Sequence, residues 1–129
     1  MKLQPDQSDV QTISGYGPGW IAVDGERIQH SVLLAWSGLR VDWHCANFGD
    51  LTGEHFARLA DIDAELVIFG SGDRIRFPKP AWLEPLMAKR IGLETMDTMA
   101  ACRTYNILAG EGRKVVAALL IENAACTCV

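Results

Sequence analysis

The 129-residue chain lacks the features that would place it in a membrane, on nucleic acid or in a secretory compartment. No apolar run approaches the roughly 20 residues that a helix needs to cross a bilayer. The net charge of −4 provides no basic surface for phosphates. Residues 1–9 contain acids and no apolar stretch, so they match neither a signal peptide nor a transit peptide. We expect a soluble cytoplasmic protein with no nucleic-acid partner and no transmembrane segment.

Signatures of common catalytic and metal sites are missing as well. No Cys-x-x-Cys pair, Gly-x-Ser-x-Gly elbow or His-Glu-x-x-His motif occurs. Cys126 and Cys128 could bind a metal or oxidise, but reduced thiols in a terminal tail are the preferred interpretation. We expect no cofactor, no metal site and no assignable catalytic residue. Whether the chain is an enzyme stays open, with the balance against it.

Cys102 is the one cysteine in an organised setting, near the start of a predicted helix and beside Arg103. That position could stabilise a thiolate. A nucleophile also needs a base, and the three histidines (His30, His44 and His55) all lie in the first half without a recognisable partner spacing. Packing is the preferred role for Cys102, because small buried cysteines usually fill space.

Length and composition fit one globular domain. Hydrophobic residues make up 49% and charged residues 22% of the chain, which is ordinary for a protein that buries a core without disulfides or metal. We predict a flexible tail over residues 1–9, a single α/β domain over residues 10–122 and a C-terminal tail over residues 123–129.

The two halves of this domain differ in pattern. From residue 11 to 43, short extended segments alternate with turn residues, including the hairpin signal Asp24-Gly25, and predict an antiparallel meander. The second half alternates strands with helices, which predicts crossovers and parallel pairing within a mixed sheet. Its expected strands are 65–69, 92–96 and 114–121. Its expected helical segments follow Thr52, start at Pro78 and span 98–109, with Pro85 kinking the second or delaying its regular part.

The helix over residues 98–109 is apolar almost all round, apart from a stripe formed by Met99, Arg103, Asn106 and Gly110. Such a helix is normally buried, so we expect it between the sheet and further protein. That protein could be the N-terminal meander or a second chain, and homo-oligomerisation is one consequence that the pattern allows.

The polar residues of this helix need partners if they lie near the interior. The preferred interpretation is a structural network in which Arg103 pairs with a carboxylate of Asp97 or Glu111 and Asn106 holds the turn before Arg113. The alternative is a pocket in which Arg103 binds an anionic group.

Two strand-to-helix turns could meet at one edge of the sheet. They are Gly70-Ser71-Gly72 and Asp97-Thr98, and ligands of open α/β sheets gather outside the carboxyl ends of parallel strands. A tight turn is the preferred role of the glycines, because they form neither a P-loop nor a dinucleotide fingerprint. The resulting candidate cluster, for a ligand or for structure, is Gly70, Ser71, Gly72, Asp97, Thr98, Arg103, Asn106, Glu111 and Arg113.

The run from Met96 to Leu108, then Glu111-Gly112-Arg113 and the strand from Val115 to Leu119, resembles a known family. Its members are small bacterial and archaeal domains of unknown function, and it includes the mitochondrial NADH:ubiquinone oxidoreductase (complex I) assembly factor 3. The turn at residues 70–72 is similar to the Gly-Thr-Gly that this family often carries. The likeness covers roughly residues 10–122 and is strongest to the short proteobacterial branch.

The resemblance implies a three-layer α/β domain, with a mixed central sheet flanked by helices and a small antiparallel section from the N-terminal half. It implies no reaction, because the bacterial members have no established one. The mitochondrial relative is an assembly helper that works through protein partners. Transfer of that role is analogy.

Three functional hypotheses follow, in order of preference. The first is a non-enzymatic interaction or assembly-factor-like module, whose partner is a respiratory-complex subunit or the chain itself. The second is a small-ligand or anion-binding protein, or an enzyme, with a pocket near Gly70–Gly72, Thr98 and Arg103. The third is redox or metal handling through Cys102 and the pair Cys126 and Cys128.

Overall fold

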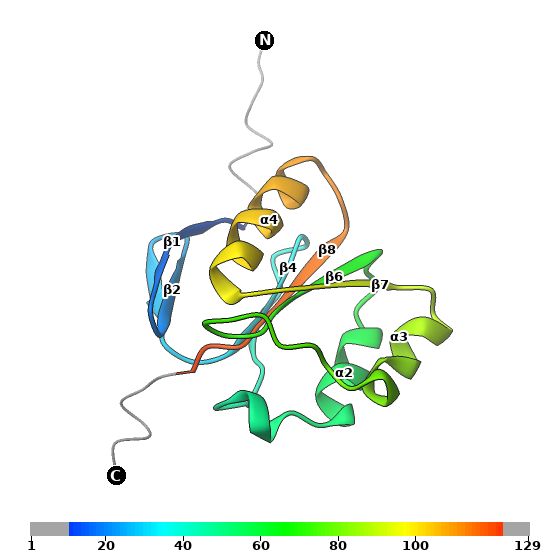
Figure 1. Ribbon diagram of the computed structural model, residues 1–129. Coiled ribbons are helices and arrows are strands. Elements are labelled where there is room, and N and C mark those ends of the chain that lie inside the picture. The colour runs from blue at the N-terminus through cyan, green and yellow to red at the C-terminus, as the bar shows by residue number, and fades with distance from the viewer. Residues whose placement is uncertain (1–10, 123–129) are drawn as a thin grey trace.

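The computed structural model describes residues 11–122, so the predicted tails at residues 1–9 and 123–129 lie outside the described residues. Within that range two β-sheets and three α-helices form three layers (Figure 1). A small antiparallel sheet contains β1 (Ile13–Gly17), β2 (Trp20–Val23) and β3 (Glu26–Ile28). The larger sheet has the order β5-β4-β8-β6-β7. Its strands are β4 (Val32–Ala35), β5 (Arg40–Asp42), β6 (Leu66–Gly70), β7 (Gly92–Met96) and β8 (Val115–Leu119).

The predicted mixed sheet is confirmed. β6 pairs in parallel with both β7 and β8, whereas β4 pairs antiparallel with β8 and β5. The hairpin at Asp24-Gly25 joins β2 to β3, and φ is 50° and 88° at its two residues, as a two-residue hairpin turn requires. The single meander predicted over residues 11–43 was wrong in one respect, because β4 and β5 join the central sheet instead of the small one.

The helices lie close to their predicted positions. They are α2 (Gly53–Ala60), α3 (Glu84–Ala88) and α4 (Thr98–Gly110), with short 3-10 helices η1 (Phe48–Asp50) and η2 (Pro80–Leu83). Pro85 lies in the first turn of α3, where its missing N–H costs nothing, so it delays the regular helix and does not kink it.

The two faces of the central sheet are buried against different layers. Alternate residues point to opposite faces: in β6, Val67 and Phe69 face α2, η2 and α3, whereas Ile68 faces α4 and the small sheet. Figure 1 shows α2 and α3 on one side of the sheet and α4 with β1 and β2 on the other. α4 packs on β6 and β8 of the central sheet and against β1 of the small sheet. The expectation that this helix is buried almost all round was wrong, because Met99, Arg103 and Ile107 on its outward side are exposed.

Close packing of α4 on the sheet depends on small residues. A Cβ added to Gly70, at the end of β6, would lie 3.0 Å from the Cα of Thr98 and 3.1 Å from the Cβ of Ala101. Glycine at this position therefore lets the first turn of α4 approach the sheet backbone directly. This approach fixes where the helix begins relative to the strand ends.

Candidate functional site

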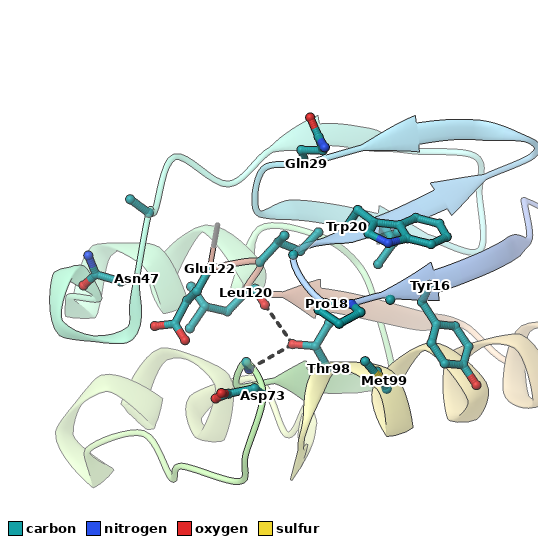
Figure 2. A pocket seen from close by; sticks show the side chains of 16 residues that line it. Tyr16, Pro18, Trp20, Gln29, Asn47, Asp73, Thr98, Met99, Leu120 and Glu122 are labelled. Atoms are coloured by element: carbon teal, nitrogen blue, oxygen red, sulfur yellow. Dashed lines mark hydrogen bonds between the residues drawn. The ribbon is translucent and has the colours of Figure 1, made fainter. Parts of the chain in front are cut away.

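A cleft of about 660 Å³ lies where the three parallel strands end. Gly72, Thr98 and Leu120, which follow β6, β7 and β8 by one or two residues, line it together. The chain leaves β6 towards α3 on one face and leaves β7 towards α4 on the other. Adjacent parallel strands whose connections diverge in this way leave a crevice at their carboxyl ends. The edge of the sheet that the sequence singled out does carry a cleft (Figure 2).

The hydroxyl of Thr98 joins the three strand ends. Its Oγ1 accepts a hydrogen bond from the Gly72 N–H at 2.9 Å and donates one to the Leu120 carbonyl at 2.8 Å (Figure 2). The backbone N–H of Thr98 also bonds to the Gly72 carbonyl at 2.8 Å. The two predicted turns therefore meet, and the threonine side chain, which is buried, is fully used in holding them together.

The start of α4 is not a free anion site. Asp97 caps it by accepting a hydrogen bond from the Ala100 N–H at 2.9 Å, and the Ala101 N–H bonds to the Asp97 carbonyl. A carboxylate already occupies the positive end of the helix dipole. The charged side chains that line the cleft among the described residues, Asp73 and Glu122, are also acidic. This chemistry disfavours an anionic ligand.

Ser71, between the two glycines, has a structural role. Its Oγ accepts a hydrogen bond from the Arg76 N–H at 2.8 Å and donates to the Arg74 carbonyl at 2.7 Å. Gly72 has φ +104°, and an added Cβ would collide with the guanidinium of Arg76 and the carboxylate of Glu122. The tight-turn role preferred for these residues agrees with this geometry.

Sequence reasoning missed two residues that shape the cleft, Arg76 and Glu122. One oxygen of Glu122 accepts a hydrogen bond from Arg76 Nη2 at 2.5 Å, and the other accepts one from the Phe48 N–H at 2.8 Å. The Arg76 guanidinium also donates to the Ser71 carbonyl at 2.6 Å and lies 4.8 Å above the Phe48 ring. These partners are 46 and 74 residues apart in sequence from Glu122, so no local spacing could have indicated them.

Arg103 lies elsewhere, and the prediction that it pairs with a carboxylate near the interior was wrong. Its side chain is exposed on α4, and Nη1 donates to the hydroxyl of Tyr16 at 3.1 Å. The guanidinium carbon lies 5.9 Å from the Tyr16 ring centroid. α4 contacts β1 through this pair, so a half-buried aromatic partner replaces the expected buried acid.

Asn106 does not hold the turn after the helix, as predicted, but ties α4 to β1. Its Oδ1 accepts a hydrogen bond from the Ile13 N–H at 2.9 Å, and its Nδ2 donates to the Ile13 carbonyl at 2.8 Å. One amide therefore satisfies both backbone groups of a residue in an edge strand. The need for partners was predicted correctly, and their identity was not.

The remaining residues of the predicted cluster are separated from the cleft. Arg113 lies 3.4 Å from Glu65, an exposed pair at the start of β6 and β8. A hydrogen bond from the Lys114 N–H, with help from Arg113, lowers the pKa of Glu65. Glu111 follows α4, and its N–H bonds to the carbonyls of Ile107 and Leu108. Because these residues lie at the carboxyl end of a 13-residue helix, they cannot join a site at its start.

Cys102 packs in the core, in agreement with the role preferred for it. It is fully buried between α4 and the sheet, and burial raises its pKa to about 12. Its neutral thiol cannot act as a ready nucleophile at neutral pH. His55 contacts Trp43 on the opposite face of the sheet. Across residues 11–122, no group of three His, Cys, Asp or Glu side chains could hold a metal ion.

Aromatic residues line the other end of the cleft. Trp20 and Tyr16 come from β2 and β1 and flank the turn that contains Pro18 (Figure 2). The Arg27 guanidinium stacks 4.1 Å from the Trp20 ring centroid. A cleft with aromatic and aliphatic walls at one end and carboxylates at the other is suited to an amphipathic or donor-bearing group.

Comparison with known proteins identifies the family. A family model described as protein of unknown function (DUF498/DUF598) matches residues 13–120. The chain belongs to this family. A bovine (Bos taurus) relative, NADH dehydrogenase [ubiquinone] 1 alpha subcomplex assembly factor 3, is 31% identical over 92% of the chain, which spans only 65% of that protein. The resemblance that the sequence suggested is confirmed.

Bacterial relatives match over nearly their whole length. An uncharacterized protein of Rhodobacter capsulatus is 34% identical, and the match covers 91% of this chain and 90% of that protein. A crystal structure of a protein from Bordetella parapertussis is 38% identical with a TM-score of 0.82, covering 88% of this chain and 97% of that chain. The three-layer architecture is thus shared with a solved relative. In the described part of the chain, no helix has the length and apolarity needed to cross a membrane.

Proposed function

We propose that the chain is a non-enzymatic protein-interaction module of the assembly-factor kind, with a subunit of a respiratory complex as its partner. The outward side of α4 carries this proposal. Met99 and Ile107 are 37% and 61% exposed there, and Arg103 lies between them. An outward-facing isoleucine on a helix whose inner side is already buried gains stability only when another surface covers it.

The composition of this surface fits protein recognition. Met99, Arg103, Ile107 and the neighbouring Tyr16, here named the α4 outer face, combine apolar, aromatic and guanidinium groups. Aromatic residues, methionine and arginine are the types enriched at protein interfaces, and tyrosine and arginine are common hot spots. Tyr16 and Met99 also line the cleft, so one partner could cover the face and enter the cleft.

Kinship supports the same function. The bovine relative is named as an assembly factor for NADH dehydrogenase, and the candidate site of this chain lacks a reactive thiol or a nucleophile–base pair among its described residues. An assembly factor that acts by binding other proteins needs neither a reactive thiol nor a nucleophile–base pair. The chain covers only part of that relative, so its partner is proposed here by analogy.

Co-purification from the native cell at native expression tests the proposal. We expect the wild-type chain to recover a reproducible respiratory-complex subunit, and Ile107→Asp to lose it by roughly tenfold or more, since an apolar contact becomes a buried charge. Arg58→Ser, an exposed change on α2 across the sheet, is the matched control. Recovery of no reproducible partner, or equal recovery with both variants, contradicts the proposal. A mass measurement on the purified chain separates self-association from a foreign partner.

Small-ligand binding is a second candidate, favoured by the cleft itself. With Asp97 capping α4 and Asp73 on the rim, the ligand would be neutral or cationic, and Arg103 takes no part. A fragment screen followed through the amide resonances of Gly72 and Met99 tests this candidate. Saturable shifts confined to the cleft support it, and their absence across donor-bearing aromatic fragments counts against it.

A further inference from the structure

The segment of residues 73–90, which joins β6 to β7 through η2 and α3, differs from the rest of the chain. It carries five basic and two acidic residues, a net charge of +3, whereas the other residues total −7 because the whole chain is −4. It also holds three of the five large apolar side chains that are well exposed among the described residues: Ile75 (53%), Phe77 (74%) and Met87 (68%). Exposed apolar groups and positive charge are therefore concentrated in one segment of the chain.

The start of this segment is held in a fixed conformation. Ser71 Oγ bonds to both the Arg74 carbonyl and the Arg76 N–H, and the Arg76 guanidinium is tied to Glu122 and to the Ser71 carbonyl. Pro78, two residues after Arg76, is buried. With Arg76 and Pro78 facing inward, Ile75 and Phe77 face outward. The two apolar side chains are displayed by a fixed backbone, and their exposure does not come from a loose loop.

Positive charge surrounds the exposed apolar groups. Arg74 and Lys79 flank Ile75 and Phe77, and Arg90 follows Met87 after α3; all three basic residues are exposed. Phenylalanine and isoleucine inserted at headgroup level, with basic side chains at the phosphates, are the combination that binds anionic lipid surfaces. These basic residues are spread over a loop and the end of a helix and do not converge on one described contact, so their charge favours an extended anionic surface as the partner.

We propose that the 73–90 segment is a peripheral membrane-contact site that binds the surface of an anionic lipid bilayer. Ile75, Phe77 and Met87 enter the headgroup region, and Arg74, Lys79 and Arg90 contact lipid phosphates. α3 and α4 cover opposite faces of the central sheet. A chain held at a bilayer through this segment therefore keeps the α4 outer face accessible. The proposal does not depend on the partner of that face.

Vesicle flotation of the full chain tests the proposal, with phosphatidylcholine vesicles and with vesicles of equal phosphatidylcholine and phosphatidylglycerol. We expect binding to the mixed vesicles only, and its loss at high salt, because screening removes the phosphate contacts. Phe77→Ser should weaken binding roughly tenfold or more, since it removes the most exposed apolar side chain. The double change of Arg74→Glu and Lys79→Glu should weaken it to a similar extent at low salt.

Ile107→Ser is the matched control, because it removes an apolar side chain of comparable exposure from the opposite face, and it should leave flotation unchanged. No binding to anionic vesicles overturns the proposal, as does binding that persists in Phe77→Ser. Equal loss in Phe77→Ser and Ile107→Ser assigns the lipid contact to a different surface and also overturns it. If vesicles are not bound but a photo-crosslinker at position 77 captures one protein in the cell, the segment is a protein-docking site instead.

Discussion

The two faces of the central sheet are built from different side chains. Against α2 and η2, the core is aromatic: Trp43, Phe56 and Phe69 meet edge to face with ring centroids 5.4–6.0 Å apart, and Trp82 stacks on Phe56. Against α4, the core is made mostly of small and aliphatic residues, with Tyr105 as its one fully buried aromatic side chain among the described residues. Large interlocking rings favour stability, whereas small residues allow the close approach that sets the position of α4. One face mainly stabilises the fold, and the other positions the cleft and the α4 outer face.

The largest expected effect is on the aromatic face. Phe56→Ala should reduce the free energy of unfolding by about 3–5 kcal/mol, because it leaves a cavity among three aromatic rings. Chemical denaturation followed by tryptophan fluorescence measures the loss. Partner recovery should stay at the wild-type level at temperatures where the variant is folded. If folded Phe56→Ala failed to recover the partner, the aromatic face of the sheet would also contribute to binding, and the two faces would not have separate roles.

A smaller loss is expected at the strand ends. Thr98→Val keeps the shape of the side chain but leaves the Gly72 N–H and the Leu120 carbonyl without their partner. An unpaired buried group costs about 1–3 kcal/mol, and water in the cleft replaces part of the lost hydroxyl, so we expect a total decrease of about 1–3 kcal/mol in the free energy of unfolding. Thr98→Ser retains the hydroxyl and serves as the control in the same denaturation experiment. A loss in Thr98→Ser as large as that in Thr98→Val would show that the methyl group contributes as much as the hydroxyl bridge, and would contradict the account.

Asn106→Ala tests the hydrogen bonds that connect α4 to β1. Two hydrogen bonds to Ile13 are lost, and we expect a decrease of about 1–2 kcal/mol in the free energy of unfolding. Hydrogen exchange at the β1 amides should accelerate more than exchange at β6, since the loss is local. Uniform acceleration across both strands would place Asn106 in the global core instead.

The smallest effect at neutral pH concerns the buried thiols. Burial raises the pKa of Cys45 to about 11 and that of Cys102 to about 12, from 9.0. Well below pH 9 both thiols are neutral in the folded and unfolded chains, so their ionisation does not change stability. As the pH rises towards and past 9.0, the thiols of the unfolded chain ionise first. The free energy of unfolding then falls until the pH exceeds the raised pKa values of the folded chain.

Peptide-resolved alkylation at neutral pH checks this expectation. Cys45 and Cys102 should react only as fast as the chain unfolds, and denaturant should expose both. Rapid native alkylation of Cys102 would reopen the redox hypothesis. Cys126 and Cys128 lie outside the described residues, and their alkylation is measured on a separate peptide.

Much of the fold could be predicted because its signals are local. The Asp24-Gly25 hairpin, the strand at 92–96 and the helix at 98–109 each follow from neighbouring residues. The assignment of β4 and β5 to the larger sheet could not be predicted, because either antiparallel arrangement satisfies the same alternation.

The candidate site also has a part that could be predicted from the sequence and a part that could not. The meeting of Gly72 and Thr98 was predictable from strand ends, since carboxyl ends of parallel strands share an edge. The partners of Arg103, Asn106 and Arg76 were not, because each lies on an element distant in sequence or on a turn whose conformation the sequence does not specify. Charge alone suggested acids for Arg103, whereas the nearest suitable group was the hydroxyl of Tyr16.

Site-specific photo-crosslinking in the native cell tests the central claim most directly, that the outward side of α4 binds a protein. A photoactivatable residue replaces Ile107 in one variant and Arg58, exposed on α2, in the other. We predict a discrete crosslink to one respiratory-complex subunit from position 107 and none from position 58. Equal labelling from both positions, or no protein crosslink from position 107, would contradict the claim.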